Sequence, residues 1–387
     1  MIKLAQNTID KEDIRLLIEW LSQEETPRLT KDKLTEEFEA EWSKKCGQKY
    51  SVFVNSGSSA ILLGLYSLLE GGYLKNQKVV ISSLSWITDV SSVVQIGLTP
   101  ILCDCNLTDL SVDLGNLEEI FIREQPAALI LVSVLGLVPR MKEIVDLCNK
   151  YDVILFEDVA ESLGSKYQEQ RLGTFGKIST YSLYFGHTIS SIEGGIITTD
   201  DFDLYELMIS LRSHGWDRDQ SKETQQKLRT EWNIDNFNHF YTFHFAGFNL
   251  RSTDLQAFIG LNQLKKLDKY CEIRHNNFLI YLDKIKINEL VLTEKELDFT
   301  SNFAFPIVSK NREKIVKSLI KNQIEVRPLI AGSIARSPFW IKRFGLQALI
   351  NCDKIHNYGF YLPNHQELTI DEINFICKLV NEVKDEI

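Results

Sequence analysis

Residues 50–72 read YSVFVNSGSSAILLGLYSLLEGG, and they contain the transition that decides the fold. The run 50–54 is β-branched and aromatic, which predicts a buried strand. The run 58–70 has the apolar spacing of a helix. A turn of small residues, NSGS, joins the two. This stretch therefore predicts a strand that passes directly into a helix.

The same alternation continues to residue 160. Apolar strand-like runs occupy residues 77–86, 99–105, 128–136 and 152–160, with helical stretches between them. Such alternation predicts a mainly parallel sheet covered by helices on both faces. Ligands of these sheets bind beyond the carboxyl ends of the strands. We therefore expect a site where residues 55–59, 85–86 and 157–158 meet.

The flanking segments predict helices and a second domain. Residues 28–47 predict a helix capped by Thr30 and ended by Gly47. Residues 253–285 predict one long amphipathic helix, and shorter strands and helices follow it, such as 301–308 and 311–322. We expect a large α/β domain over residues 1–255 and a small α+β domain over residues 256–387.

Composition excludes several classes of protein. The net charge of −10 argues against a binder of nucleic acid or of acidic membranes, because phosphate backbones need a basic surface. No apolar run is long enough to span a membrane, and the N-terminus does not resemble a signal peptide. The chain has seven scattered cysteines, an odd number that suits reduced thiols in a cytoplasm.

The cysteines do not predict a metal site. Cys103 and Cys105 point the same way along a strand, but two ligands do not make a closed zinc site. Cys271, Cys352 and Cys377 are isolated in the sequence. We expect no bound metal.

Taken singly, the candidate site residues each have two interpretations. The turn at 57–59 is either an anion site at a helix N-terminus or only a helix cap. Trp86 either stacks on a flat ring or packs in the core. Asp158 either pairs with a buried cation or caps the next segment. His187, which follows Gly186, is either a functional base or an ordinary hydrogen-bonded histidine.

Together, seven motifs resemble one family in their order and spacing. They are NSGSSA (55–60), SLSWITDV (83–90), FEDVAESLG (156–164), YSLYFGH…EGG (181–195), LRSHGWDRD (211–219), FNLRSTDLQAFIG (248–260) and RPLIAGSIAR (327–336). The chain resembles, over nearly its whole length, the DegT/DnrJ/EryC1/StrS sugar aminotransferase-like family. That resemblance implies the fold of type I enzymes that use pyridoxal phosphate (PLP), with a mainly parallel sheet of the seven-stranded type.

The resemblance also implies seven cofactor-binding residues. They are Gly57, Ser58, Ser59, Trp86, Asp158, Glu161 and Ser182. The residues at 57–59 would hold the phosphate, and Ser182 would bond the phosphate or the cofactor hydroxyl region. Trp86 would stack on the pyridine ring, and Glu161 would bond its hydroxyl. Asp158 would keep the pyridine nitrogen protonated, so that the ring withdraws electrons.

Four more residues occupy positions where the family contacts its substrates. They are His214, Arg251, Arg327 and Arg336. Arg251 would meet the carboxylate of L-glutamate. The other two arginines would meet a substrate carboxylate or a nucleotide diphosphate, since guanidinium groups bind both in a bidentate way. The resemblance further implies a homodimer, with the aromatic run 237–248 reaching across its interface.

His187 falls where the family's aminotransferases carry the lysine that links PLP covalently. Imidazole is not a primary amine, so it cannot form that link, but it can act as a base near neutral pH because its usual pKa is about 6.5. The FGH…EGG and SHGWDRD motifs resemble those of the nucleotide-sugar 3-dehydratases, and most of all those acting on GDP-4-keto-6-deoxymannose in colitose-type deoxysugar synthesis.

This resemblance implies a sequence of chemical events. L-Glutamate converts non-covalently bound PLP to pyridoxamine phosphate (PMP), and PMP condenses with carbon 4 of a nucleotide 4-ketosugar. His187 removes a proton from the cofactor, the hydroxyl at carbon 3 is expelled, and ammonia is released. The expected product is a 3-deoxy-4-ketosugar.

Three alternatives stay open. A sugar aminotransferase that has lost its lysine is one, although the intact FGH and SHGW context argues against simple decay. An iron–sulfur CDP-sugar 3-dehydratase is another, although it needs a cysteine cluster in the C-terminal half. The third is a non-catalytic binding or regulatory protein, against which the retention of Asp158 and Trp86 speaks.

Overall fold

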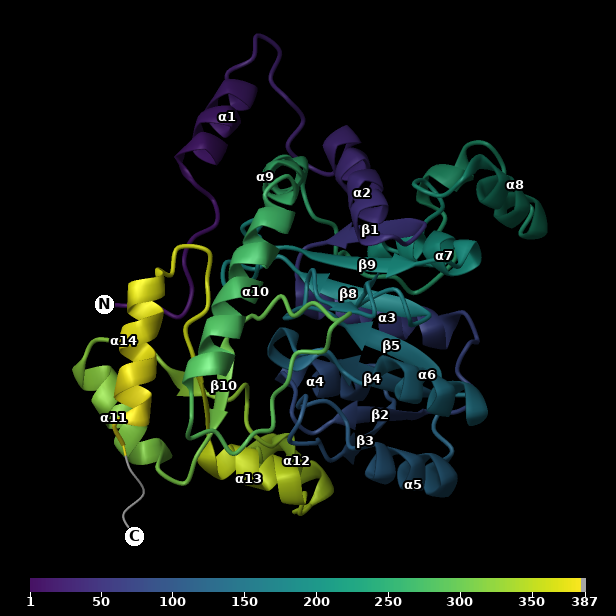
Figure 1. The fold of residues 1–387 in the computed structure, drawn as a ribbon. Helices are drawn as coiled ribbons and strands as arrows, with labels where there is room; N and C mark the ends of the chain where they lie inside the picture. Colours follow the sequence, from purple (N-terminus) through teal and green to yellow (C-terminus); the bar gives the residue numbers. More distant parts are fainter. Residues whose placement is uncertain (384–387) are drawn as a thin grey trace.

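A computed structural model describes residues 1–383, and two sheets organise it (Figure 1). The larger sheet has the strand order β1-β9-β8-β5-β4-β2-β3. Its strands are β1 (Tyr50–Val54), β2 (Lys78–Ser82), β3 (Thr99–Cys103), β4 (Ala128–Val132), β5 (Ile154–Asp158), β8 (Ile178–Ser182) and β9 (Gly195–Thr199). β9 runs opposite to the other six strands, pairing antiparallel with β1 and β8, and all other pairs are parallel, so the expected mainly parallel sheet of seven strands is confirmed.

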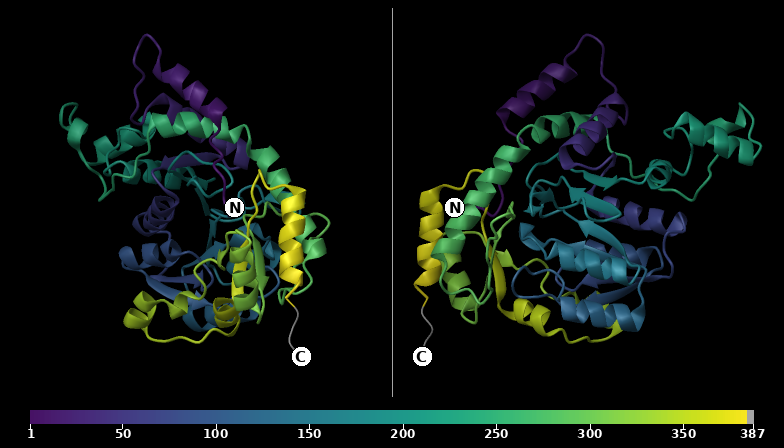
Figure 2. Two further views of the ribbon diagram at one scale, coloured as in Figure 1. Left: turned by 90° about the vertical axis from the view of Figure 1, so that its left-hand side faces the viewer. Right: turned by 45° about the vertical axis from the view of Figure 1, so that its right-hand side comes forward.

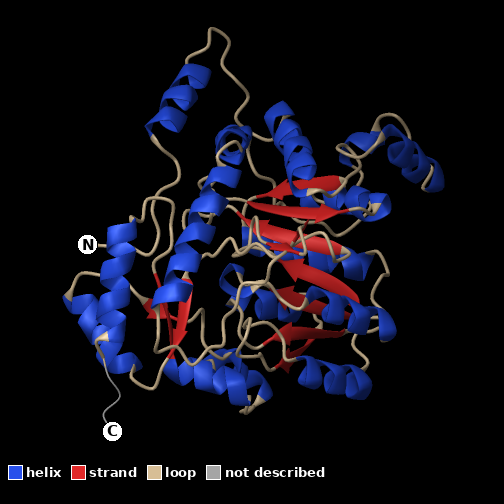
Figure 3. Ribbon diagram, in the orientation of Figure 1, coloured by secondary structure: helices blue, strands red, loops and turns tan. Residues whose placement is uncertain are grey.

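Alternate residues of each strand enter two separate cores, one on each face of the sheet. In β4, Ala128 and Ile130 face one core, whereas Leu129 and Leu131 face the other. Figure 3 shows the strands between layers of helices. The first core is closed by α3 (Gly57–Glu70), α4 (Ile87–Gln95) and α7 (Phe202–Arg212), and the second by α2 (Lys33–Cys46), α5 (Leu114–Glu124) and α6 (Met141–Lys150). Burial on both faces explains why the strands are continuously apolar.

The predicted cap of the second helix is wrong. That helix, α2, begins at Lys33, so Thr30 lies outside it. The carboxylate of Asp254 accepts the N–H groups of Asp32, Leu34 and Thr35 at 2.7, 3.0 and 3.0 Å. The cap therefore comes from a distant helix. Gly47 ends α2 in the left-handed region, at φ +89°, as predicted.

The long helix predicted over residues 253–285 is two helices, α9 (Asp254–Leu264) and α10 (Leu267–Lys284). The chain tightens between them, because the N–H of Lys266 bonds the carbonyl of Gln263 only three residues earlier. At this turn the N-terminal segment docks: Lys266 pairs with Asp10 and Asp13, the latter in α1 (Lys11–Leu21). This tertiary contact leaves no mark on the apolar pattern.

The C-terminal part forms its own antiparallel sheet beside α10 (Figure 2). Its order is β10-β12-β11, with β10 (Phe305–Val308), β11 (Arg327–Pro328) and β12 (Gly359–Leu362). Its helices are α11 (Arg312–Lys321), α12 (Pro338–Phe344), α13 (Ile350–Tyr358) and α14 (Ile370–Asn381). This is the small α+β unit that was expected. Residues 384–387 of the range proposed for it lie outside the described residues.

The remaining elements are short or peripheral. They are α8 (Lys222–Glu231), the two-stranded pair β6 (Lys166–Tyr167) and β7 (Gln170–Arg171), and the 3₁₀ turns η1 (Val134–Gly136), η2 (Asn238–Tyr241) and η3 (Ile334–Arg336). Figure 2 shows α8 projecting away from the body. Across residues 1–383, no helix has both the length and the apolar character that crossing a membrane requires.

Candidate active site

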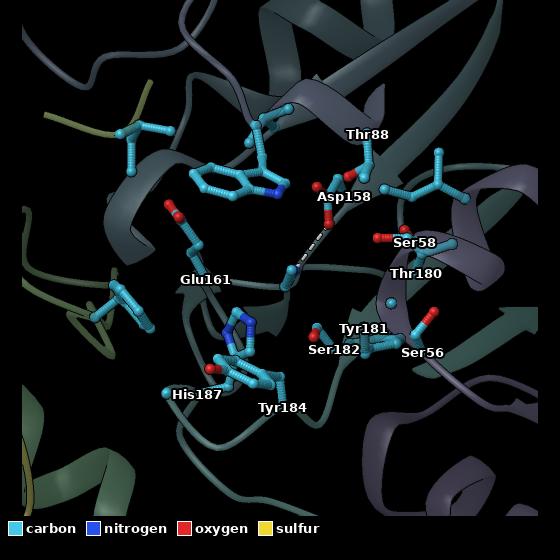
Figure 4. A pocket seen from close by; sticks show the side chains of 18 of the residues that line it. Ser56, Ser58, Thr88, Asp158, Glu161, Thr180, Tyr181, Ser182, Tyr184 and His187 are labelled. Atoms are coloured by element: carbon cyan, nitrogen blue, oxygen red, sulfur yellow. Dashed lines mark hydrogen bonds between the residues drawn. The ribbon is translucent and has the colours of Figure 1, made fainter. Parts of the chain in front are cut away.

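A cavity of about 610 Å³ lies beyond the carboxyl ends of the parallel strands. Segments that follow β1, β2, β4, β5 and β8 all contribute to its wall, as the strand alternation predicts. The C-terminal part closes it with Phe303, Ile330 and Tyr361. Figure 4 shows the polar side chains of the large sheet converging on this space.

One end of the cavity is built to receive an anion. Gly57 and Ser58 line it at the N-terminus of α3, where unpaired N–H groups favour negative charge. Gly57 packs against Ser182, and a Cβ at position 57 would lie 2.7 Å from the Cβ of Ser182. Only glycine allows this approach. Ser59 does not line the cavity: its N–H donates to the Ser56 hydroxyl at 3.1 Å, and that hydroxyl donates to Oγ of Ser59 at 3.0 Å.

Asp158 lies at the end of β5 with its carboxylate toward the middle of the cavity (Figure 4). Its Oδ1 accepts the N–H of Ala160 at 2.9 Å. Burial raises the pKa of Asp158 to about 6, against the lowering effect of that amide bond. A cation in the cavity would relieve this cost. Trp86 lines the same space yet is 56% exposed, so its ring is free to stack on a flat ligand.

Glu161 lies one turn further along the chain and is partly buried in the cavity wall. Its Oε2 accepts the N–H of Leu135 at 2.8 Å. Desolvation, followed by the charge of Asp158, raises the pKa of Glu161 to about 7. Near neutral pH this carboxyl group can therefore donate a hydrogen bond to a ligand hydroxyl or accept one from it.

His187 projects into the cavity beside Tyr184 and Glu161 (Figure 4). Its backbone N–H bonds the carbonyl of Tyr184 at 3.0 Å, and its ring lies 5.5 Å from that of Phe303. Its Nδ1 is buried without a hydrogen-bond partner among the described residues. Desolvation, and then the charge of Arg274, lowers the pKa of His187 to about 4. The imidazole is thus neutral at pH 7 and able to accept a proton.

None of the four expected substrate contacts lines the cavity in the single chain: His214, Arg251, Arg327 and Arg336. His214 is held in the left-handed region, at φ +65°, with its ring 5.2 Å from that of Trp216. The backbone of Arg251 forms an isolated antiparallel β-bridge with Val54 at the end of β1, and its side-chain Nε donates to Oδ1 of Asn249 at 3.1 Å. Arg251 therefore lies close to the loop that follows β1.

The other two arginines pair with carboxylates of the C-terminal part. Arg327, on the exposed strand β11, forms an ion pair with Glu325. Arg336 binds Asp353 through two nitrogens, with Nε 2.8 Å from Oδ1. A substrate phosphate would have to replace these partners, so the guanidinium of Arg336 is less available than that of Arg327, which is 54% exposed.

Several residues that line the cavity were not predicted from the sequence. They are Thr88, Thr180, Tyr184, Glu193, Phe303, Ile330 and Tyr361. The strand-end rule selected Ser56 within residues 55–59, and it could also have found Thr88, two residues after Trp86. Phe303, Ile330 and Tyr361 reach the site only through the packing of the C-terminal part, which no local pattern reveals.

Cys352 is isolated in sequence but not in space. Its Sγ lies 3.3 Å from the Sγ of Cys105, and the carboxylate of Asp104 is nearby. That carboxylate accepts the N–H groups of Cys105, Asn351 and Cys352, each at 2.9 Å, so it caps α13. The hydrogen bond with the Cys352 thiol, and then burial, raise the pKa of Cys105 well above its usual value. The geometry is that of a thiol pair packed under a helix cap.

Comparison with known proteins identifies the family. The model of the DegT/DnrJ/EryC1/StrS aminotransferase family matches residues 7–381. GDP-4-keto-6-deoxy-D-mannose 3-dehydratase of Escherichia coli O55:H7 is 30% identical over 362 residues, covering 91% of this chain and 92% of the relative.

Solved structures of the same family include both a dehydratase and an aminotransferase. A GDP-4-keto-6-deoxymannose-3-dehydratase with a trapped PLP-glutamate geminal diamine has a TM-score of 0.88 and 27% identity, covering 98% of this chain and 100% of that one. A second solved structure is a Helicobacter pylori aminotransferase involved in the biosynthesis of pseudoaminic acid. It has a TM-score of 0.84 and 25% identity, with 98% coverage of each chain.

The cavity fits the cofactor of this family. It offers an anion cradle at Gly57 and Ser58, an open aromatic face at Trp86, and at Asp158 a buried carboxylate that has no cationic partner within residues 1–383. These are the groups that the phosphate, the ring and the protonated nitrogen of PLP require. The chain therefore belongs to the DegT/DnrJ/EryC1/StrS aminotransferase family, a family of PLP-dependent sugar aminotransferases and dehydratases.

Proposed function

We propose that this chain is a nucleotide-sugar 3-dehydratase that removes the C3 hydroxyl of a 4-keto-6-deoxy sugar, with L-glutamate as amino donor. One observation carries the proposal: His187, a neutral imidazole, projects into the cavity where the family's aminotransferases have a lysine. The 30% identity to a GDP-4-keto-6-deoxy-D-mannose 3-dehydratase supports the GDP-linked sugar as the first substrate to test.

Bound as PMP, the cofactor would supply an amine for the sugar carbonyl and an electron-withdrawing ring. The chain's own residues would orient that ring. Gly57 and Ser58 would hold its phosphate, Trp86 would cover one face, and Asp158 would keep a proton on its nitrogen. Glu161 would bond its hydroxyl, in either protonation state, because the pKa of this carboxyl group is about 7.

His187 would move the one proton that the elimination requires. The neutral imidazole would act as the base for the acidic carbon that the bound cofactor supplies. The resulting imidazolium then gives this proton to the hydroxyl that leaves carbon 3, so that water departs rather than hydroxide. Its pKa, lowered to about 4, makes the imidazolium a better acid for the second transfer and the imidazole a weaker base for the first. The histidine ends each turnover neutral.

The same side chain would also direct the reaction away from transamination. A lysine at this position would recapture the cofactor covalently, whereas imidazole is not a primary amine and cannot. The cofactor is then held only by non-covalent contacts such as those of Trp86 and Asp158. L-Glutamate has to restore its amine in every cycle, and ammonia is the second product.

Mass spectrometry of the product tests the proposal. The protein is incubated with PLP, L-glutamate and GDP-4-keto-6-deoxymannose, and ammonia is assayed in parallel. Loss of the C3 oxygen with release of ammonia supports a 3-dehydratase. An amino sugar formed without ammonia would contradict the proposal and favour a sugar aminotransferase, the second candidate, which the aminotransferase relatives support. CDP- and dTDP-linked 4-ketosugars in the same assay identify the nucleotide.

A further inference from the structure

A second carboxyl group lies buried beneath Asp158. Asp89 is the third residue of α4, just after Trp86, and its side chain has no exposed surface. Neither of its two carboxyl oxygens receives a hydrogen bond from any of the residues described. No step of the proposed reaction uses this group, and sequence analysis did not select it.

The position of Asp89 in the helix makes its lack of partners informative. An acidic residue at the third position of a helix often accepts the N–H of the residue that caps it. Here α4 has no side-chain cap bond, and the N–H of Asp89 donates to the carbonyl of Trp86 at 3.3 Å. The carboxyl group of Asp89 instead lies within hydrogen-bonding reach of Asp158.

Two facing carboxyl groups cannot both be ionised in this environment without a large cost. A buried carboxylate with no donor loses its hydration and gains no hydrogen bond that would compensate for this loss. The charged groups acting on Asp89 are Asp158 and Glu161, and both are acidic. Burial, then the charge of Asp158, raises the pKa of Asp89 well above its usual value. A proton on Asp89 removes the repulsion and creates a donor.

Asp158 is the partner that can use such a donor. Its Oδ1 already accepts the amide of Ala160 at 2.9 Å, and it faces the cavity, whereas Asp89 does not. A hydrogen bond from a neutral carboxyl group favours the ionised form of the group that accepts it. The proton therefore belongs on Asp89 and the charge on Asp158.

We propose that Asp89 is a positioning residue: it stays protonated and donates its O–H to Asp158, which holds Asp158 ionised and aimed at the protonated nitrogen of the cofactor. The inference rests on the proposed function only for the role of Asp158 toward the cofactor. It applies equally to a dehydratase and to an aminotransferase, so its test is independent of the sugar reaction.

Two substitutions separate this role from simple packing. In Asp89→Asn the side-chain NH₂ replaces the O–H donor, and in Asp89→Leu a side chain of similar size has no donor. We measure PLP affinity of the apoprotein by absorbance titration between about pH 6 and pH 8. Asp89→Asn should stay within about twofold of the wild type, and Asp89→Leu should bind PLP on the order of ten- to a hundredfold more weakly. The deficit should grow as the pH falls, because Asp158 without its donor is more easily protonated.

Infrared spectra of the apoprotein provide a readout that needs no cofactor. The wild-type spectrum near neutral pH, minus that of Asp89→Asn, should contain the carbonyl band of a buried, protonated carboxyl group, over and above the band that Glu161, with a pKa of about 7, gives in both proteins. Absence of this difference would overturn the proposal. It would also be overturned if Asp89→Leu, shown to be folded by circular dichroism, bound PLP like the wild type, or if Asp89→Asn were as weak as Asp89→Leu at every pH.

Discussion

At the scale of single residues, both the position and the protonation state of His187 suit the role of a general base. Its ring lies between Phe303 and Tyr184, at 5.5 and 6.5 Å, and its pKa of about 4 leaves it neutral across the physiological range. His187→Asn keeps a side chain of related shape but removes the base. We expect it to bind PLP non-covalently while dehydration slows by about 10²–10⁴-fold, the usual share of a general base.

His187→Lys is the complementary substitution. It should bind PLP covalently, detected as a mass increase after borohydride reduction, and should lose dehydration. The wild type treated in the same way should gain no mass. A lysine variant that dehydrates at the wild-type rate would refute the role given to His187.

Glu161 predicts a pH dependence of stability in the apoprotein. Its pKa is about 7 in the folded chain against an ordinary 4.5, so the folded state binds the extra proton between these values. Stability contributed by the protonated form is therefore present below about pH 4.5 and is lost as the pH rises to about 7. Relative to the wild type, Glu161→Gln should gain on the order of 2 kcal/mol over this interval, because glutamine never ionises.

Urea unfolding of the two apoproteins at pH 5 and pH 8 measures this difference. Each comparison is made at one pH, so the titration of His187 and His365, whose pKa values of about 4 oppose the trend, cancels between the two proteins. A constant difference between variant and wild type at both pH values would count against the raised pKa of Glu161.

At the scale of elements, Asp254 connects the start of α9 to the start of α2. Its carboxylate accepts three backbone N–H groups there and also the hydroxyl of Thr35 at 2.7 Å. Removal of a buried acceptor leaves those donors unpaired. Asp254→Ala should lower the free energy of unfolding in urea by roughly 2–3 kcal/mol.

Asp32→Ala is the matched control for that substitution. Asp32 occupies the N-cap position of α2, yet its side chain makes no cap bond. Its substitution should change the free energy of unfolding by less than about 0.5 kcal/mol. A larger loss for Asp32→Ala than for Asp254→Ala would mean that the cap is local after all.

The elements show what local patterns can and cannot predict. Strand–helix alternation predicted the mainly parallel sheet and placed the site at its carboxyl edge, because each strand end is marked by a change of period and by small or polar residues, whereas the number of seven strands came from the family resemblance. It misplaced the cap of α2 because the true acceptor, Asp254, is 222 residues away from Asp32 in sequence. Caps of this kind depend on tertiary packing, which hydrophobic periodicity does not record.

At the scale of the whole molecule, the C-terminal part supplies cavity residues that could not be predicted from the sequence. Phe303 and Tyr361 close the cavity, and Cys352 meets Cys105 across the same interface between the two parts. The residue types alone gave no signal at these positions, since an aromatic residue in a loop is usually a packing residue. The family resemblance predicted roles for the motif residues, and geometry was needed to find their neighbours.

The segment around η2 carries the last prediction, which concerns assembly. Phe237 is 82% exposed and Tyr241 is 76% exposed, although both are aromatic. Large aromatic side chains exposed together in one segment are typical of an interaction surface. By its resemblance to the family, this run would reach across a homodimer, and His214 and Arg251, which do not line the cavity of the single chain, would then belong to a site completed at the interface.

Sedimentation equilibrium measures the assembly directly. The wild type should sediment as a dimer of the 44.6 kDa chain, and Phe237→Asp combined with Tyr241→Asp should shift it toward the monomer. Ile320→Asp, at an apolar residue of α11 that is 61% exposed, is the control and should leave the dimer intact. Because the aromatic side chains are solvated in the single chain, the double variant should keep its fold, and circular dichroism checks this. A wild type that sediments as a monomer at every concentration would refute the interface and leave the cavity to act within one chain.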